Sequence, residues 1–358
     1  IFNVSINTYS ATGTYEENEY TDDNGDMYVA VKFTDDGTIT FDQDVSADYL
    51  VVGGGGSGGR NGGGGGGGGG GGVNVDENIT FNSDTYTITI GDGGVFSGAA
   101  NTMGTTGGDT TFGTIVAKGG GGGGGGMNGT SPGGSGGSGG GGGASSSGGS
   151  AINSSMGNNG AAGGTNQGGG GGGAGSAASG MTGGSGIANT FYDGNTVYYA
   201  KGGWGAYNNH EDNFSYISSG TDNLGEGGGG GDQDHGKFNG GSGVVIIRFL
   251  KYQSYEETTS TDIISSYSHP TENVNYNSVK LTDGQIGLIK FDQVTLVNYL
   301  LVGGESTPSN SLDNDYWSGT DETYEGLTII EDTTVLNTDI SYHISTESGA
   351  IFNDITAA

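Results

Sequence analysis

The sequence predicts an all-β protein in which β-strands lead into packed polyglycine II helices, followed by a smaller β domain. Three observations support this fold class. Glycine supplies 85 of the 358 residues and forms long uninterrupted runs. Apolar residues outside the runs alternate with polar ones, which is typical of strands. One strand pattern also occurs twice, in copies that lie about 250 residues apart.

These patterns divide the chain into three parts. We expect a β lead-in at 1–52, a glycine-rich polyglycine II domain with aromatic loops at 53–250, and a degenerate repeat of the β frame at 251–358. The repeat supports the last boundary, because FDQDVSADYLVVGG (41–54) matches FDQVTLVNYLLVGG (291–304). The second copy lacks the long glycine runs, so the β frame is expected to exist without them.

The strands themselves are predicted from alternation and from turn residues. A turn is expected at 35–37 and a hairpin tip at 22–26, because Asp-Gly and Asn-Gly favour tight turns. The segment 22–26 also resembles part of a calcium loop but lacks the downstream bidentate Glu. The expected strands are 27–33, 38–41, 49–52, 85–90, 111–117 and 244–250.

The glycine runs fit either a packed bundle or a flexible linker. A helix of three residues per turn rises ~3.1 Å per residue, so the eleven glycines at 62–72 would span ~34 Å. The runs have limited lengths and alternate with strand-like or aromatic segments, which favours the bundle. Ser135 and Ser138 lie three residues apart, so a helix over 133–143 is expected at the outside of the bundle. The runs are 53–59, 62–72, 119–126, 133–143, 168–175 and 227–231.

The order of motifs around the runs resembles a known family. The motifs are YLVVGGGGSGG (49–59), YTITIGDGG (86–94), TTFGTIVAKGGGGGGGG (110–126) and GGSGVVIIRF (240–249). Together they resemble the glycine-rich domain of phage tail-fibre and adhesin proteins. The resemblance implies layered polyglycine II helices whose connecting loops contact the host surface.

Composition narrows the possible partners. The chain has 40 acidic and 9 basic residues and a formal charge of −31. Phosphate binding depends on Lys and Arg, so no nucleic-acid partner is expected. No apolar run approaches the ~20 residues of a membrane span, so no membrane insertion is expected. Because the chain begins with Ile1, we expect it to be processed or part of a longer product.

The segment 189–217 is the candidate recognition site. Tyr, Trp, Asn and Gly combine rigid amphipathic rings with adaptable polar groups, as recognition loops do, and aromatic faces also suit sugar rings. The alternative is that these rings cap the bundle or pack against another subunit. The candidate receptor-binding residues are Phe191, Tyr192, Tyr198, Tyr199, Trp204, Tyr207, His210, Phe214 and Tyr216. Weaker candidates are the inserts 127–132, 144–167 and 232–239.

No catalytic site is predicted. The glycine runs match nucleotide-binding and nucleophile-elbow patterns by composition alone, without the strand–turn–helix context that those motifs need. Only His210-Glu-Asp212 and Asp232-Gln-Asp-His235 combine histidine with carboxylates, and solvated loops explain both. We therefore expect no enzyme, no metal and no cofactor.

The leading hypothesis is an extracellular fibre or adhesin component at a virion surface, of the phage type. It would present loops on a polyglycine scaffold to a host receptor or glycan, and would assemble with other fibre subunits or as a homo-oligomer. The alternative is a purely structural fibre, capsid decoration or filament subunit assembled through the β flanks. Ice binding by a flat polyglycine face is a third hypothesis.

Overall fold

A computed structural model describes residues 2–22, 26–60, 62–96, 101–125, 131–207, 217–232 and 238–256, and the backbone of the later strands. The chain forms two compact units. One is Asn7–Lys251, and the other combines Ile1–Ile6 with Tyr252–Ala358. All regular elements among the described residues are strands, so the predicted all-β class is confirmed. The described part of the chain holds no helix that could cross a membrane.

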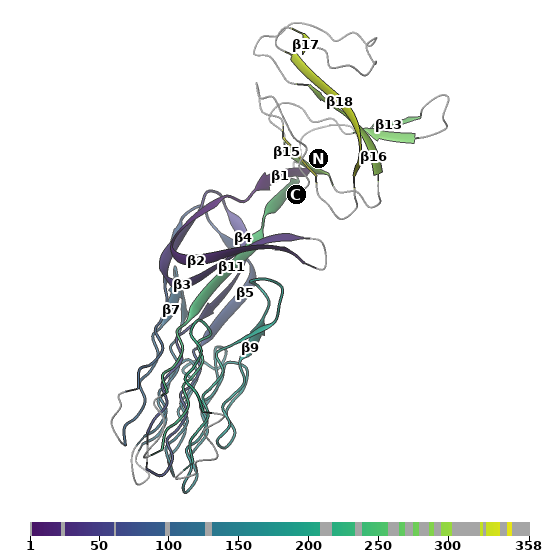
Figure 1. The fold of residues 1–358 in the computed structure, drawn as a ribbon. Coiled ribbons are helices and arrows are strands. Elements are labelled where there is room, and N and C mark those ends of the chain that lie inside the picture. Colours follow the sequence, from purple (N-terminus) through teal and green to yellow (C-terminus); the bar gives the residue numbers. More distant parts are fainter. Residues whose placement is uncertain are drawn as a thin grey trace. The chain divides into compact units, whose positions relative to one another are not determined.

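The unit Asn7–Lys251 is built on an eight-stranded sheet of order β5-β4-β11-β3-β6-β7-β8, with β2 also paired to β3. The sheet is nearly closed, since β5 and β8 lie near each other. The glycine runs extend side by side from one end of it (Figure 1). The strands are β2 (Tyr9–Thr21), β3 (Met27–Phe41), β4 (Val45–Val52), β5 (Val73–Phe81), β6 (Thr85–Thr89), β7 (Thr110–Phe112), β8 (Ile115–Ala117) and β11 (Val244–Leu250).

The predicted turn at 35–37 is wrong, because β3 runs through it without a break. The strand changes partner there: Tyr28–Phe33 pair with β11, and Gly37–Thr40 pair with β6. At the same place β2 approaches β3 very closely, since a Cβ on Gly37 would lie 2.2 Å from the carbonyl oxygen of Thr12. The Asp36 carboxylate accepts a hydrogen bond from the Ile90 N–H (2.8 Å), at the end of β6.

The predicted strand at 111–117 is two strands joined by a tight turn. Residues 110–112 form β7 and residues 115–117 form β8, which pair antiparallel with Phe112 opposite Ile115. Gly113 has φ +55°, a left-handed conformation that only glycine adopts without strain. The apolar residues on both sides of Gly113 concealed this turn in the sequence.

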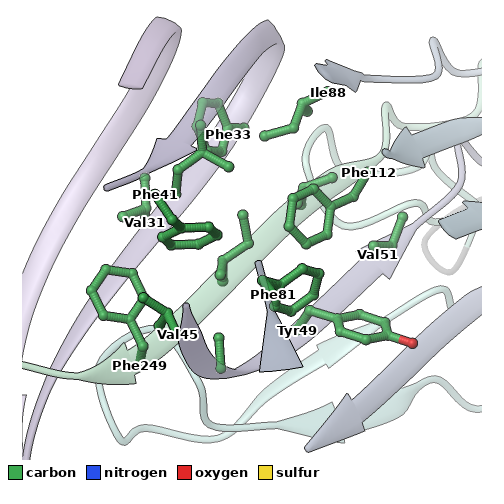
Figure 2. Packing of buried hydrophobic residues seen from close by; sticks show 14 of the residues in the cluster. Val31, Phe33, Phe41, Val45, Tyr49, Val51, Phe81, Ile88, Phe112 and Phe249 are labelled. Atoms are coloured by element: carbon green, nitrogen blue, oxygen red, sulfur yellow. The ribbon is translucent and has the colours of Figure 1, made fainter. Parts of the chain in front are cut away.

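The main core lies on one face of the sheet (Figure 2). Alternate residues of the central strands point to opposite faces, so Val245, Ile247 and Phe249 of β11 enter this core. Val244 and Ile246 enter a second cluster on the other face, with Leu50 and Val52 of β4. This two-sided burial explains the unbroken apolar runs of β4 and β11. Phe33, Phe41, Phe112 and Phe249 are fully buried, and each contributes about 1.5–3 kcal/mol.

The glycine run at 64–72 lies at the centre of the bundle and bonds to six neighbouring runs. Its N–H groups donate hydrogen bonds of 2.7 to 3.0 Å to three of these neighbours. Gly65, Gly68 and Gly71 donate to 225–231, and Gly66, Gly69 and Gly72 donate to 118–124. Gly67 and Gly70 donate to 169–172. Its carbonyl groups accept hydrogen bonds from the other three neighbours, 53–59, 138–144 and 203–206.

The hydrogen bonds of this run therefore repeat every three residues. A helix of three residues per turn points every third peptide group in the same direction, which is the geometry of the polyglycine II conformation. The conformation itself stays a prediction, and the period and the six-neighbour packing support it. The runs are thus held by each other, which argues against a flexible linker in the described part of the bundle.

The expectation of one outer helix over 133–143 is wrong. The segment reverses direction near Ser135: Gly134 donates to Gly122 (2.8 Å) and Gly140 donates to Gly134 (2.8 Å). Ser135 is exposed, but Ser138 is completely buried. The three-residue spacing of the two serines does not place them on one side, because the turn lies between them.

Ser138 also provides a test of how a buried polar group affects the stability of the bundle. Its hydroxyl is buried and has no hydrogen-bond partner among the described residues, and an unsatisfied buried group costs about 1–3 kcal/mol. We expect Ser138→Ala to raise the free energy of unfolding by about 1 kcal/mol in urea titrations. Ser57 is equally buried but accepts a bond from the Thr105 N–H (2.8 Å), so Ser57→Ala should lower stability. Equal effects of the two substitutions would contradict this account.

The other unit contains short sheets. β1 (Phe2–Ile6) pairs with β12 (Tyr252–Glu256) and β15 (Ile286–Ile289), and β15 pairs with β19 (Tyr342–Ser345). β16 (Thr295–Val302) covers the positions that match β4 in the sequence repeat, so both copies form a strand there. The remaining strands are β13 (Ser265–Ser268), β14 (Asn275–Ser278), β17 (Thr323–Tyr324) and β18 (Leu327–Leu336).

Candidate functional site

The first half of the candidate segment is a small hairpin. β9 (Ile187–Asn189) and β10 (Val197–Tyr199) pair antiparallel, with Tyr199 opposite Ile187. Short polar contacts shape the loop between them: the Asn189 side chain accepts a bond from the Phe191 N–H (2.9 Å), and the Asp193 carboxylate accepts one from the Asn195 N–H (3.0 Å). Such Asx turns are local, so the sequence itself fixes the path of the loop.

The hairpin packs against the sheet and buries two of the candidate residues. Phe191 and Tyr199 are each only 4% exposed and belong to the second hydrophobic cluster, beside Leu50, Val52 and Ile246. Tyr192 is partly buried against the same cluster. In this arrangement Phe191 and Tyr199 hold the insert in place, which corresponds to the packing alternative raised for these rings.

Arg248 of β11 fastens the hairpin to the sheet. Its guanidinium lies between two rings, 4.3 Å from the Phe191 centroid and 4.6 Å from that of Tyr28. It donates to the Asp48 carboxylate (2.7 Å) and to the Tyr20 hydroxyl (2.8 Å). Burial disfavours the charged form, but the bonds to Tyr20 and Asp48 outweigh it, so the pKa of Arg248 is raised.

Tyr192 connects the hairpin to β2 and β3. Its hydroxyl donates to the Glu16 carboxylate (3.3 Å), and the Lys32 ammonium lies 5.1 Å from its ring centroid. Its carbonyl accepts a bond from the Asn18 side chain (3.1 Å). Burial, and then the nearby Glu16, raise the pKa of Tyr192. This residue therefore also has a structural setting at the edge of the sheet.

The outward-facing candidates are Tyr198, Trp204 and Tyr207. Tyr198 is 50% exposed and Trp204 is 38% exposed, whereas Tyr207 is half-buried. Lys201, which the sequence prediction did not include, lies between them in the chain. Its ammonium makes an ion pair with Glu226 (3.3 Å) and lies 5.9 Å from the Tyr198 ring centroid. His210, Phe214 and Tyr216 lie outside the described residues.

Of the three weaker candidate inserts, the structure describes one in full and only small parts of the other two. The insert 144–167 is largely part of the bundle, since Gly149 donates to Gly140 (2.7 Å) and Gly160 donates to Gly149 (3.0 Å). Most of 127–132 and 232–239, and the histidines of both predicted clusters, lie outside the described residues. Among all the residues that the structure describes, no group of three or more His, Asp and Glu side chains could hold a metal ion. Asp232 is buried, and its carbonyl accepts a bond from Arg60 Nε (3.0 Å).

Burial of Tyr199 predicts a loss of stability in alkali. Burial raises the pKa of Tyr199 from 10.0 to about 12. The folded state therefore holds this proton more tightly than the unfolded state, and the stabilisation is complete below about pH 10 and is lost as the pH rises toward 12. Urea titrations between these pH values should show a falling free energy of unfolding. The fall should be smaller in Tyr199→Phe, and an unchanged pH dependence in that variant would contradict the assignment.

One comparison with known proteins identifies the glycine-rich part of the chain. A family model described as a glycine-rich domain matches residues 34–250. The match covers more than half of the chain, so the chain belongs to this family of glycine-rich domains. The comparison with curated proteins gives no match.

Proposed function

We propose that this protein is a non-enzymatic component of an extracellular fibre at a virion surface, of the phage tail-fibre or adhesin type. It presents side chains on a glycine scaffold for recognition of a host-surface receptor or glycan. Its other partners are fibre subunits, including further copies of this chain, and neither nucleic acid nor membrane insertion is part of the role.

One observation carries the proposal: the bundle exposes large apolar side chains on a scaffold held by its own backbone. Val95 and Ile152 are each 63% exposed, and Tyr198 is 50% exposed. Side chains exposed to this degree are available for contact with a partner molecule. The glycine lattice fixes their positions without using side chains of its own, so sequence changes at the surface leave the scaffold intact.

Two further observations support it. The order of the glycine motifs resembles that of phage tail-fibre domains, whose loops contact the host. The net charge of −31 favours solubility and disfavours polyanionic partners.

The test is binding of the full-length chain to cells. Fluorescently labelled protein should bind candidate host cells saturably, and an excess of unlabelled protein should displace it and reduce infection by the parent virus. A heat-denatured sample serves as the control. Absence of surface binding, together with absence of any effect on infection, would overturn the adhesive role.

A purely structural fibre or filament subunit is the second candidate, and the long strand β2 favours it. Within the described residues β2 pairs only with β3, so its other edge is open to a strand of another copy. Glu16, Glu17 and Glu19 oppose such pairing by repulsion. Electron microscopy of the purified chain separates the two functions, since long polymers would favour the structural one.

A further inference from the structure

Side chains at the end of the β9–β10 hairpin and along the run that follows it are exposed at every third position. Tyr198, Lys201 and Trp204 are exposed, and the next residue in this series, Tyr207, is half-buried. The residues between them are mostly buried; these are Tyr199, Ala200, Gly203, Gly205 and Ala206, while Gly202 is half-buried. We refer to Tyr198, Lys201, Trp204 and Tyr207 as the aromatic row.

Backbone hydrogen bonds explain this period. Residues 200, 203 and 206 donate inward, the last two to Gly68 (2.8 Å) and Gly65 (2.9 Å) of the central run. Residues 202 and 205 donate to the neighbouring run, at Gly184 (2.9 Å) and Met181 (2.8 Å). Two of the three directions around the run are therefore occupied by the bundle. The third direction is that of Lys201 and Trp204, whose side chains are exposed.

The row begins at the end of β10 and continues along the run that follows it: Tyr198 lies on β10, and Ala200, with φ +58°, turns the chain before Lys201. In a helix of three residues per turn, three residues advance about 9 Å, so the side chains from Lys201 to Tyr207 would extend over about 19 Å. The lattice fixes this spacing, because the backbone of the run is bonded on two sides. A row of exposed rings along one stretch of chain fits a linear polymer better than a compact ligand. Extended proline-rich peptides, by contrast, dock into grooves lined by aromatic side chains.

The chemistry of the row selects the kind of polymer. Tyr and Trp offer a flat apolar ring together with a polar hydroxyl or indole N–H. The ring can stack on the face of a sugar, and the polar group can form a hydrogen bond with a sugar hydroxyl. Thr182 and Ser185 on the neighbouring run are exposed and add hydroxyl groups beside the row. The Lys201 charge is balanced by Glu226, and the net charge of −31 repels acidic polymers.

We infer that the aromatic row is a binding track for a linear, neutral polysaccharide whose sugar rings stack on Tyr198 and Trp204. The inference deepens the proposed function and rests on it, since it names the ligand class and the site of surface recognition. It also places recognition along the side of the bundle, on a run whose backbone is fixed.

The test measures binding of the purified full-length chain to linear neutral oligosaccharides of increasing length. The set contains gluco-, manno- and galacto-configured chains, with alginate oligomers as the acidic comparison. Isothermal titration calorimetry should detect at least one neutral series. Within it, affinity should rise with chain length until the ligand spans the row from Tyr198 to Tyr207 and then level off. The acidic oligomers should bind more weakly.

Three substitutions assign the binding to the row. Trp204→Ala and Tyr198→Ala should each weaken binding about threefold to tenfold, because one aromatic contact is lost. Trp204→Phe should retain most of the affinity. Ile152→Ala is the matched control, since it removes an exposed apolar side chain elsewhere on the bundle. Urea titrations should show that all four variants fold.

Each failure has a distinct meaning. The inference is overturned if no neutral oligosaccharide binds, if acidic chains bind more tightly, or if Trp204→Ala and Tyr198→Ala bind like the wild type. If these two variants also adhere to host cells as the wild type does, the adhesive function stands and its site lies elsewhere. If the wild type binds oligosaccharides through the row but adheres to no cell, the track stands and the adhesive function falls.

Discussion

The substitution Gly68→Ala is expected to lower the free energy of unfolding by about 3 kcal/mol or to prevent folding, because overpacking a rigid interior costs at least this much when the backbone must move. A Cβ on Gly68 would lie 2.0 Å from the carbonyl oxygen of Gly56 and 2.6 Å from its carbonyl carbon. Both atoms belong to the backbone of a neighbouring run, so no side-chain rotation can relieve the contact. Urea unfolding, followed by circular dichroism, measures the effect.

Gly72→Ala in the same run is the matched control. There the nearest atom to a Cβ is 3.2 Å away, so a small shift suffices. Both substitutions reduce the conformational entropy of the unfolded chain in the same way, which stabilises by about 0.4–1 kcal/mol. The difference between the two variants therefore reports the close approach of the runs. If Gly68→Ala were as stable as Gly72→Ala, the runs could not be packed at backbone contact distance.

Removal of one partner of the buried ion pair is the second large effect. Arg248 and Asp48 have side chains only 15% and 9% exposed. We expect Arg248→Met to cost about 3–5 kcal/mol, because it leaves the Asp48 carboxylate buried without its counter-charge. It also removes the cation between the rings of Tyr28 and Phe191, so the hairpin β9–β10 should become accessible to limited proteolysis.

The double substitution Arg248→Met with Asp48→Leu separates charge from packing. Replacing a whole buried ion pair by apolar residues is often close to neutral, so this variant should recover much of the stability. Lys118→Ala is the surface control, since Lys118 and Asp109 are 46% and 43% exposed, and its loss should cost less than 1 kcal/mol. A cost for Arg248→Met no larger than that of Lys118→Ala would show that the buried pair does not hold the hairpin.

Much of the β frame was predictable from local patterns. The strand at 244–250 matches β11, because a short apolar run directly after glycine residues marks it. The strand at 85–90 matches β6 to within one residue, because apolar and polar residues alternate there. At the predicted hairpin tip, β2 and β3 pair antiparallel up to Thr21 and Met27, and the Asp26 N–H donates to the Asp22 carboxylate (2.9 Å); residues 23–25 lie outside the described residues. The long strand β2 was missed, since its residues are mostly polar and exposed.

The wrong predictions in the glycine region have a common physical cause. A glycine run carries no side-chain pattern, so nothing local tells where the chain turns. The reversal near Ser135 is determined by the neighbours that Gly134 and Gly140 find in space. The runs could therefore be recognised in the sequence, but their direction and their neighbours could not.

The candidate site was predicted as one cluster, and the structure divides it. Phe191 and Tyr199 belong to the hairpin and face the sheet, because strand residues alternate and β10 has a buried side. Tyr198, Trp204 and Tyr207 lie at intervals of three or six residues, and this period was visible in the sequence. It identifies the outer row only once the inner neighbours of the run are known, which is why Lys201 was missed.

The six neighbours of the central run also determine the order in which this unit can fold. Residues 53–59 precede the run directly, but its partner at 228 lies about 160 residues later in the chain, which makes the contact order high. Gly65, Gly68 and Gly71 can form their hydrogen bonds only after this distant segment has been synthesised. Folding of the bundle is consequently slow, cooperative and late, and its rate depends on chain topology more than on any single stabilising contact.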